Sequence, residues 1–449
     1  MNRDLHPGLR VAIVGAGWAG MAAAVQAVQQ GHAVDVFEAA PQPGGRARGL
    51  PLRLPDGREL MVDNGQHILI GAYTDCLRLM RTVGVDPAQA LLRRPLALRT
   101  PDGSGLALPD WPAPWDAACG ILGARGWSWR DRRALLGTAL RWRRTGFRCH
   151  PHTSVAELCA DLPPTLRRDF IEPLCVSALN TPPDQASAQV FLRVLHDALL
   201  GGRGSSHLLL PRVDLGALFP QAAARWLAAR GAQLHTGQRV QALHWQDAHW
   251  QVNRQPFDRV LIATSATSAA RIVAQSAPTA PDSIAHELQA WARQTAALTH
   301  LAITTVYAQA RAAVPGGALL RAPMLALRAS PQAPAQFVFD RDAITAATAP
   351  TGLLAFVVST SAGERDDLQT AIAAQARSQL GLAVTPLRTL TDRRATFACT
   401  PGLRRPPAAI ARGLQAAGDY VEGPYPATLE GAVRSGLQAA RALGSAAPR

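Results

Sequence analysis

The chain has 449 residues, of which 48% are hydrophobic and 17% are charged. At about 100–200 residues per domain, this length predicts two or three domains, each with its own core. No uninterrupted apolar run approaches the roughly 20 residues that cross a bilayer, which argues against a transmembrane protein. The first residues enter an apolar strand without a small-residue cleavage site, so we expect no secretory signal and a cytoplasmic location.

The 46 basic and 32 acidic residues give a formal charge of +14, and every basic residue is arginine because the sequence contains no lysine. A positive surface attracts anionic lipids, phosphorylated metabolites or nucleic acid. No helix-turn-helix, zinc-finger or RNA-binding aromatic motif accompanies the charge, so nucleic acid is not an expected partner. The six cysteines form no CxxC pair and have no histidine at metal-ligand spacing, which predicts neither a disulfide framework nor a metal site.

The N-terminal region contains a strand, a glycine turn and a helix. Residues 10–14 are a short β-branched apolar run, and residues 21–30 are an alanine-rich helical stretch. The GxGxxG pattern between them is typical of a dinucleotide-binding turn. Its first glycine permits the turn, the second lets the backbone approach a pyrophosphate, and the third packs the helix on the strand. The predicted cofactor-binding residues of this turn are Gly15, Ala16, Gly17, Trp18, Ala19 and Gly20.

A second apolar strand, 33–37, leads directly to Glu38. A carboxylate at this place accepts hydrogen bonds from ribose hydroxyls and repels a 2′-phosphate, which disfavours NADP. The segment 43–49, PGGRARG, follows, and a simple nicotinamide dehydrogenase has no need of it. With these residues the chain resembles the flavin-containing amine oxidase and phytoene desaturase superfamily. The resemblance implies FAD as the cofactor, with its pyrophosphate surrounded by Gly44, Gly45, Arg46 and Arg48. A guanidinium fork suits a phosphate, although Arg48 is interpreted equally well as a surface charge.

Two later segments extend this resemblance. Residues 218–263 indicate a helix, a strand reaching Val240, a tryptophan-bearing hairpin and a further apolar strand, and the resemblance places Val240 on the adenine side of FAD. Near the C-terminus, a strand ends in a Gly-Asp pair and precedes an amphipathic helix. The resemblance implies that this helix directs its positive dipole end at the flavin ring. The residues implied in this segment are Gly418, Asp419, Thr428, Leu429 and Glu430, of which Thr428 is by chemistry alone a good N-cap.

Residues 61–71, MVDNGQHILIG, resemble more specifically the hydroxysqualene dehydroxylases (squalene-associated FAD-dependent desaturases) of bacterial hopanoid pathways. Stretches 170–181, 337–341 and 395–401 extend this likeness. The resemblance implies that hydroxysqualene and reduced FAD give squalene, water and oxidised FAD. It also implies a long apolar isoprenoid substrate, functional coupling with presqualene diphosphate and hydroxysqualene synthases, and cofactor contacts from Gly65, Gln66 and His67.

Such a reaction needs a hydride at the flavin, a proton donor for the departing hydroxyl and a dry apolar channel. His67 is the candidate acid because an imidazole titrates near neutrality, and Asp63 is a candidate for orienting it or for binding the flavin. The alternative is that both residues only fix a turn beside the cofactor. Glu172 and Asn180 are further candidate catalytic residues on the substrate side, and Glu172 is equally well a helix-end charge.

Residues 109–149 contain five of the ten tryptophans and eight arginines. A basic helix with tryptophan and leucine suits a bilayer interface, which favours a peripheral location at the inner face of the cell membrane. The alternative is that the tryptophans line the apolar substrate domain and the arginines form a solvated face. The two interpretations are compatible, since the mouth of a channel can be both.

Together these patterns predict an α/β protein with an amine-oxidase-like architecture. A Rossmann-type FAD-binding domain, with a parallel sheet and a β-meander, is expected from residues 1–75, 208–275 and 405–449. A mixed α+β substrate domain is expected from residues 76–207 and 276–404. Three other functions stay open: a carotenoid-type polyene (phytoene) desaturase, a flavin amine oxidase, and a non-catalytic flavoprotein of the membrane surface. Amine oxidases commonly use a lysine-bound water, which a lysine-free chain cannot provide.

Overall fold

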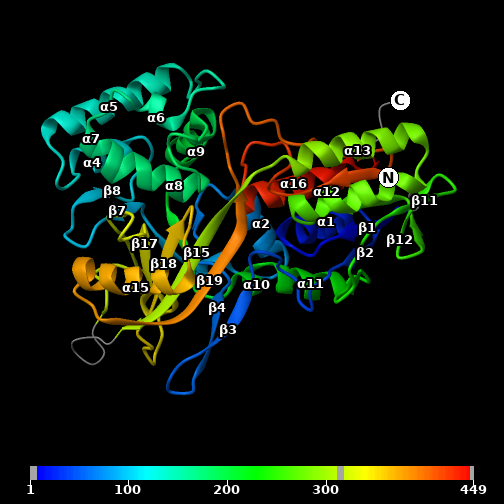
Figure 1. The fold of residues 1–449 in the computed structure, drawn as a ribbon, viewed down its shortest axis with the longest axis horizontal. Coiled ribbons are helices and arrows are strands. Elements are labelled where there is room, and N and C mark those ends of the chain that lie inside the picture. The colour runs from blue at the N-terminus through cyan, green and yellow to red at the C-terminus, as the bar shows by residue number, and fades with distance from the viewer. Residues whose placement is uncertain (1–7, 311–317, 445–449) are drawn as a thin grey trace, which may run out of the picture.

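The computed structural model describes residues 8–310 and 318–444, so the outermost residues of the expected FAD segments, 1–7 and 445–449, lie outside it, as do residues 311–317. A six-stranded sheet forms one half of the molecule (Figure 1). Its strands follow the order β10-β2-β1-β14-β21-β20, and all neighbours are parallel except the last pair. Three distant segments of the chain therefore meet in one sheet. Their bounds are β1 (Arg10–Val14), β2 (Ala33–Phe37), β10 (Gln233–His235), β14 (Arg259–Ile262), β20 (Ala409–Ala411) and β21 (Leu414–Ala416).

Both faces of this sheet are covered, which is why its central strands are continuously apolar. Val11 and Ile13 of β1 pack toward the layer of α1 (Trp18–Gln29), α11 (Pro220–Ala228) and α16 (Leu429–Arg441). Ala12 and Val14 point to the opposite face, since successive side chains of a strand alternate. That face is covered by a β-meander and a helix pair, formed by β11 (His244–Gln246), β12 (His249–Val252), β13 (Gln255–Phe257), α12 (Ala266–Ser276) and α13 (Asp282–Ala296).

A five-stranded antiparallel sheet forms the other half, in the order β16-β17-β18-β15-β19. Alternate residues of its strands divide between two cores: Val306 and Phe356 pack beneath α15 (Arg365–Gln375), whereas Tyr307 and Phe339 face the centre of the molecule. The inner face is therefore available to wall a cavity between the halves. The strands are β15 (His300–Ala310), β16 (Met324–Ala326), β17 (Phe337–Asp340), β18 (Leu353–Ser359) and β19 (Val384–Phe397).

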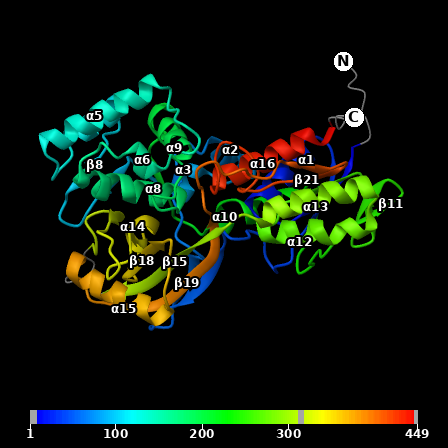
Figure 2. The same cartoon turned by 45° about the horizontal axis from the view of Figure 1, so that its top comes forward.

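A helical layer lies over the inner face of this second sheet, with α5 outermost and α8 beneath it (Figures 1 and 2). A π-helical turn precedes α8, and Pro173 stands at the second position of α8. Proline removes a backbone donor and clashes with the preceding turn, so the wider π turn accommodates it. The helices of this layer are α4 (Trp115–Leu122), α5 (Trp129–Arg144), α6 (Val155–Leu158), α7 (Pro164–Leu166), η1 (Arg167–Ile171), α8 (Glu172–Leu179) and α9 (Ala188–Leu200).

Shorter elements connect the two halves. They are the hairpin β3 (Gly49–Arg53) and β4 (Glu59–Asp63), the small sheet β5 (Leu69–Ile70), β9 (Leu208–Pro211) and β6 (Leu91–Arg94), the pair β7 (Ala97–Arg99) and β8 (Gly105–Ala107), and the helices α2 (Thr74–Thr82), α3 (Pro87–Ala90), α10 (Leu215–Leu218) and α14 (Arg341–Thr345).

Within the described residues, no helix is both long and apolar enough to cross a membrane, and no group of three His, Cys, Asp or Glu side chains is arranged to hold a metal ion.

The predicted α/β class, with a parallel sheet and a meander, is confirmed. Two local predictions are wrong. The first helix begins at Trp18 rather than at residue 21, because the glycine turn leads into it directly. The strand expected to reach Val240 ends at His235, where the chain leaves the sheet and the amides of Gly237 and Gln238 bond to the loop after β2.

Candidate functional site

One cavity of about 630 Å³ lies between the two sheets and is lined by residues from the beginning, middle and end of the chain. This volume is in the range of cofactor and substrate sites. The sequence-predicted residues that line it are Gly15, Gly17, Trp18, Ala19, Glu38, Gly44, Gly45, Arg46, Arg48, Gly65, Gln66, His67, Asn180, Val240, Gly418, Asp419, Thr428 and Leu429. The cavity thus joins segments that the sequence separates by more than a hundred residues.

The three glycines of the turn differ in what a side chain would meet there. Gly15 has φ +110°, and a Cβ there would lie 2.6 Å from the carbonyl oxygen of Ala263. A Cβ at Gly20 would collide with the carbonyl of Gly15, so Gly20 serves the packing of α1 on the sheet rather than the cavity. A Cβ at Gly17 would meet nothing within 4 Å, because Gly17 borders open space in the cavity. The helix α1 has no side-chain cap there, so its first N–H groups are available to a phosphate.

Glu38 is fixed at the end of β2 by two backbone donors. Its carboxylate accepts the N–H of Ala16 at 2.7 Å and the N–H of Ala40 at 2.8 Å. A carboxylate has about four lone-pair sites, so Glu38 keeps acceptor capacity toward the cavity. Ala16, predicted as a cofactor residue, instead stands behind the cavity lining and holds Glu38 in place.

Arg46 and Asp419 were predicted as separate cofactor residues, and they pair with each other. The Arg46 Nη2 donates to Asp419 Oδ1 at 2.6 Å, and its Nη1 donates to the carbonyl of Ala395 at 2.6 Å. The neighbouring Asp419 charge raises the pKa of Arg46 above its ordinary value. Arg48 also lines the cavity, and its buried Nε has no hydrogen-bond partner among the residues that the structure describes.

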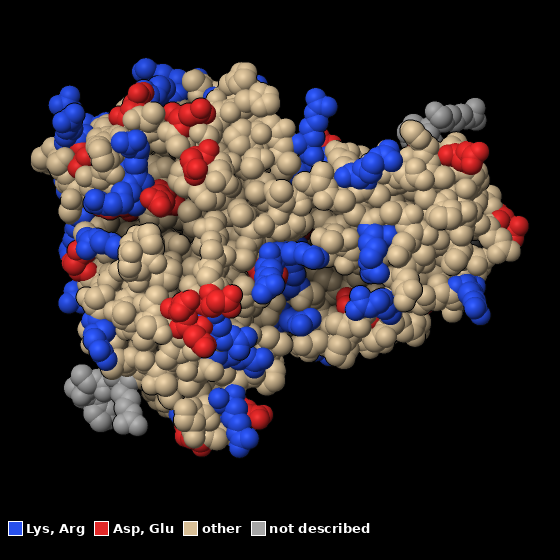
Figure 3. Space-filling model, in the orientation of Figure 1, with Lys and Arg blue, Asp and Glu red and all other residues tan. Residues whose placement is uncertain are grey.

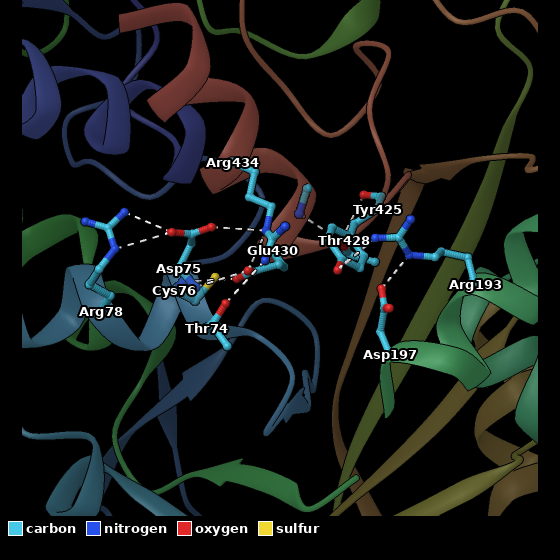
Figure 4. Close-up of polar contacts among 11 residues, drawn as sticks. Thr74, Asp75, Cys76, Arg78, Arg193, Asp197, Tyr425, Thr428, Glu430 and Arg434 are labelled. Atoms are coloured by element: carbon cyan, nitrogen blue, oxygen red, sulfur yellow. Dashed lines mark hydrogen bonds and ion pairs between the residues drawn. The ribbon is translucent and has the colours of Figure 1, made fainter. Parts of the chain in front are cut away.

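The N-terminus of α16 opens onto the same cavity. Thr428 caps the helix by accepting the N–H of Gly431 at 2.9 Å, and both Thr428 and Leu429 are in the lining. The fully buried Glu430 is outside the cavity lining and points to the start of α2 (Figure 4), which corrects its assignment as a cofactor residue. Its carboxylate accepts the N–H groups of Asp75 and Cys76 at 3.1 and 3.0 Å. Glu430 therefore caps α2 and ties it to α16.

Two arginines, one from α16 and one from the helical layer of the other half, contact the same tyrosine ring (Figure 4). Arg434 donates to Glu430 at 2.8 Å and stands 4.6 Å from the ring centroid of Tyr425. Arg193 of α9 stands 5.3 Å from the same ring and donates to Asp197 at 2.6 Å. Cation–π contacts of this kind hold the loop before α16 between the two halves.

The segment after β4 brings His67 to the cavity. His67 Nδ1 lies 2.6 Å from the carbonyl oxygen of Gly65. A carbonyl only accepts, so this geometry assigns the proton to Nδ1 and leaves Nε2 unprotonated in the neutral ring. Burial lowers the pKa of His67 below its ordinary value. The imidazolium is consequently a stronger acid than a free histidine and a smaller part of the population near pH 7.

Asp63 does not orient His67, which corrects that prediction. Its Oδ1 accepts the N–H of Leu215 at 2.8 Å, and its backbone carbonyl accepts the hydroxyl of Tyr307 at 2.9 Å. The side chain is 1% exposed and outside the cavity lining, and burial raises its pKa to about 7. Asp63 fixes the end of β4 against α10 and the second sheet.

The two substrate-side candidates differ. Glu172 is exposed on the first turn of α8 and stands outside the cavity lining, so its assignment as a proton donor is wrong. Asn180 ends α8 in the left-handed region and does line the cavity. Its amide donates to Thr396 Oγ1 at 2.9 Å and accepts the N–H of Thr360 at 2.9 Å. These bonds make Asn180 a cross-link between α8 and the second sheet.

The cavity has an apolar end that motif analysis did not identify as a site. It is walled by side chains from α8, from the inner face of the second sheet and from the segment after β4. The signal available in the sequence was the alternation of phenylalanines in the strand 337–340, which places two of them on one face. The residues are Ile68, Val176, Ile303, Phe337, Phe339 and Val357.

The sequence model of the flavin-containing amine oxidoreductases matches residues 18–444. The chain belongs to this family. Across 95% of its length it is 28% identical to the hydroxysqualene dehydroxylase of Zymomonas mobilis, covering 97% of that protein. It is 27% identical to the hydroxysqualene dehydroxylase of Rhodopseudomonas palustris, with 98% of both chains covered. The resemblance to these enzymes is therefore confirmed.

The crystal structure of an oxidoreductase from Methanosarcina mazei superimposes with a TM-score of 0.71 at 16% identity, covering 96% of this chain and 99% of that one. A likeness at this identity concerns the fold. Membership of the flavin-containing family makes the protein an FAD-dependent oxidoreductase.

The cavity of this flavin-containing oxidoreductase fits FAD on its own geometry. Gly17 leaves open space where a pyrophosphate has to approach the backbone, and the N-termini of α1 and α16 both reach the lining. The buried unpartnered Nε of Arg48 is a donor that an anionic group satisfies. Glu38 and Val240 both line the cavity, and the carboxylate of Glu38 has acceptor capacity that a ribose hydroxyl would use.

Proposed function

We propose that this protein removes the hydroxyl group of hydroxysqualene and replaces it with hydrogen, which gives squalene and water. End-to-end similarity to two hydroxysqualene dehydroxylases carries the proposal, because it includes the substrate-side half as well as the cofactor segments. The apolar end of the cavity, with Phe337 and Phe339 in its wall, supports a hydrocarbon substrate. Burial of a long apolar chain there is favourable by about 25 cal/mol per Å² of surface removed from water.

The chain's own residues divide the work along the cavity. Reduced FAD, when bound, supplies the hydride that forms the new C–H bond. Gly17, Glu38 and Arg48 hold the pyrophosphate and ribose end. Asp419, oriented by Arg46, accepts hydroxyl groups of the sugar chain, and the N-terminus of α16 stabilises negative charge at the flavin ring. The apolar wall excludes water from the reacting carbon.

We assign the proton for the departing hydroxyl to Nε2 of protonated His67. The C–O bond breaks with its electron pair on oxygen, the proton completes the water molecule, and the hydride fills the carbon. The lowered pKa of His67 makes its imidazolium a better donor, at the cost of a smaller protonated fraction. The bond from Nδ1 to the Gly65 carbonyl holds the ring so that Nε2 is the titrating atom.

We also propose that the enzyme works on the inner face of the cell membrane. Hydroxysqualene and squalene are apolar isoprenoids that partition into bilayers. The upstream partners are enzymes that make presqualene diphosphate and hydroxysqualene. A peripheral attachment lets the substrate pass from one enzyme to the next without entering water.

An anaerobic single-turnover experiment tests the reaction. The purified protein in detergent is reduced chemically and mixed with hydroxysqualene, the visible flavin absorbance is followed, and the hydrocarbon is identified by mass spectrometry. We expect squalene to form in step with flavin reoxidation. Flavin that stays reduced, with hydroxysqualene recovered unchanged, refutes the proposal. Phytoene offered to the oxidised enzyme then tests the polyene desaturase alternative.

A further inference from the structure

Large apolar side chains on the surface are concentrated in one region. Among the described residues, seven large hydrophobic side chains are exposed, and five of them belong to residues 111–140. None of the five is among the residues that line the cavity. They are Trp111, Trp115, Leu122, Trp129 and Leu140.

Helix α5 has two opposite apolar faces. The inward face buries Leu135 and Trp142 against the core. On the opposite side, Trp129 is 66% exposed and Leu140 is 55% exposed. These two residues are eleven positions apart, about three helical turns, so they lie on one stripe. A helix that only covers a core needs a single apolar face.

Arginines flank the outward stripe. Arg133, Arg143 and Arg144 follow Trp129 at intervals of 4, 14 and 15 residues, which places them within about 60° of the stripe on an α-helix. The whole helix holds six arginines and one aspartate, a net charge of +5. Figure 3 shows basic side chains along the edge of the molecule where α5 lies in Figure 1, with some acidic side chains among them.

The preceding helix repeats the pattern. Trp115 is 68% exposed and Leu122 is 45% exposed, seven positions apart on one face of α4. Buried Asp116 and Ile121 mark the opposite face. Since α4 packs against α5, two adjacent helices present apolar stripes to solvent.

We propose that the exposed stripes of α4 and α5, together with the arginines of α5, dock the enzyme on a bilayer surface that contains anionic lipid. Tryptophan rings prefer the headgroup boundary, arginines pair with lipid phosphates, and leucines enter the acyl region. This proposal deepens the proposed function by naming the docking surface.

The position of the surface fits delivery of an apolar substrate. Helix α5 packs on α7 at the start of the segment that continues through η1 into α8. Trp127, just before α5, stacks edge-on against Phe170 of that segment at 5.6 Å. Val176 and Leu179 of α8 line the cavity. The helical layer thus carries the docking surface on its outer helix α5 and part of the cavity wall on α8, which lies beneath α5 (Figure 2).

Vesicle binding by the FAD-loaded protein tests the docking surface. Cosedimentation is measured with vesicles of phosphatidylcholine alone and of phosphatidylcholine with phosphatidylglycerol, at low and high salt. We expect binding to the anionic vesicles that weakens with salt. The double variant Trp129→Ala/Leu140→Ala should reduce that partitioning at least about tenfold. The matched control is Met61→Ala/Val213→Ala, which removes the two exposed hydrophobic side chains outside the region.

Circular dichroism and flavin content establish that both variants are folded. Unchanged partitioning of Trp129→Ala/Leu140→Ala overturns the proposal, and so does an equal loss in the control. The proposal is also overturned if the parent does not bind vesicles but self-associates, and if Trp129→Ala/Leu140→Ala abolishes that self-association. The exposed face would then bind a second copy of the chain. Vesicle binding needs no turnover, so failure of the dehydroxylation experiment leaves this result intact and refutes only the proposed reaction.

Discussion

The most informative single change is Glu430→Ala, because this carboxylate serves the frame of the cofactor cavity without facing it. Its two oxygens accept the N–H groups of Asp75 and Cys76, in the first turn of α2, and one of them also accepts Arg434. The substitution leaves one buried and one partly buried N–H group without an acceptor at the start of α2 and removes half of an ion pair. We expect α2 to open locally while the rest of the fold persists.

The expected cost follows from these contacts. Loss of a helix cap costs about 1 kcal/mol, and hydrogen bonds to a charged group contribute about 1.5–3 kcal/mol each. Arg434 keeps Asp75 at 3.1 Å and its side chain is 27% exposed, so its unpaired charge stays partly hydrated and adds little. The two bonds to Glu430 are themselves the cap, so they are counted once, and each takes the lower value because the bond from Asp75 is only partly buried. We therefore expect about 3 kcal/mol in total, which corresponds to about a hundredfold increase in the open population of α2.

Cys76 reports this opening directly, because the thiol is buried within the first turn of α2. The rate of its labelling by a thiol reagent, followed by mass spectrometry of the Cys76 peptide, should rise about a hundredfold in Glu430→Ala. Glu430→Gln retains one acceptor oxygen, so its labelling rate should lie between those of the parent and Glu430→Ala. The control Glu364→Ala, at an exposed carboxylate before α15, should leave the rate unchanged. A Glu430→Ala protein whose Cys76 is labelled at the parent rate would refute the reasoning.

Three further changes separate the roles assigned along the cavity. His67→Gln should retain yellow FAD and lose most turnover. In the parent, the turnover rate should rise as the pH falls through the lowered pKa of His67, and the same pH profile in the variant would exclude His67 as the proton donor. Asp419→Asn should weaken FAD binding, measured by flavin content after purification, since it loses the charge that pairs with Arg46; full occupancy would contradict the assignment. Asp63→Asn should change stability with pH: the folded parent binds more protons than the unfolded chain between the ordinary carboxyl pKa and about 7, so its free energy of unfolding falls as the pH rises through that window. Denaturant titrations should therefore show the variant gaining about 4 kcal/mol on the parent between pH 4 and pH 8, and a constant difference would mean that Asp63 is not buried in this way.

The cofactor half of the cavity was largely predictable, because its elements are local. A strand, a glycine turn and a helix are recognised within one window of sequence, and Gly15, Gly17 and Glu38 line the cavity as their spacing implies. The roles of acidic residues near the motifs were harder to assign. Asp63 and Glu430 have suitable side chains beside cavity residues, yet the fold directs both to helix N-termini in other segments. Sequence proximity does not determine side-chain direction when the partner is 150 or more residues away.

The substrate half was less predictable for the opposite reason. Its wall consists of ordinary apolar side chains from separate strands, such as Ile303, Phe337 and Val357. Phe337 belongs to a stretch that extends the family resemblance, but that stretch did not assign any of these side chains to the site. The same residue types fill the core beneath α15, so only the pairing of strands decides which face borders the cavity.

Placement of the reacting groups therefore depends on contacts between the halves more than on either half alone. Gln66 donates its N–H to Thr305 of β15 at 3.2 Å and accepts Arg341 of α14 at 3.2 Å, which fixes the segment that holds His67 against the second sheet. Asn180 ties α8 to β19 on the other side of the apolar end. The bonds of Gln66 are buried and that of Asn180 is partly buried, so each unmade bond costs about 1–3 kcal/mol. A shift of one half relative to the other breaks several at once, which keeps the polar and apolar ends of the cavity aligned for a transfer between them.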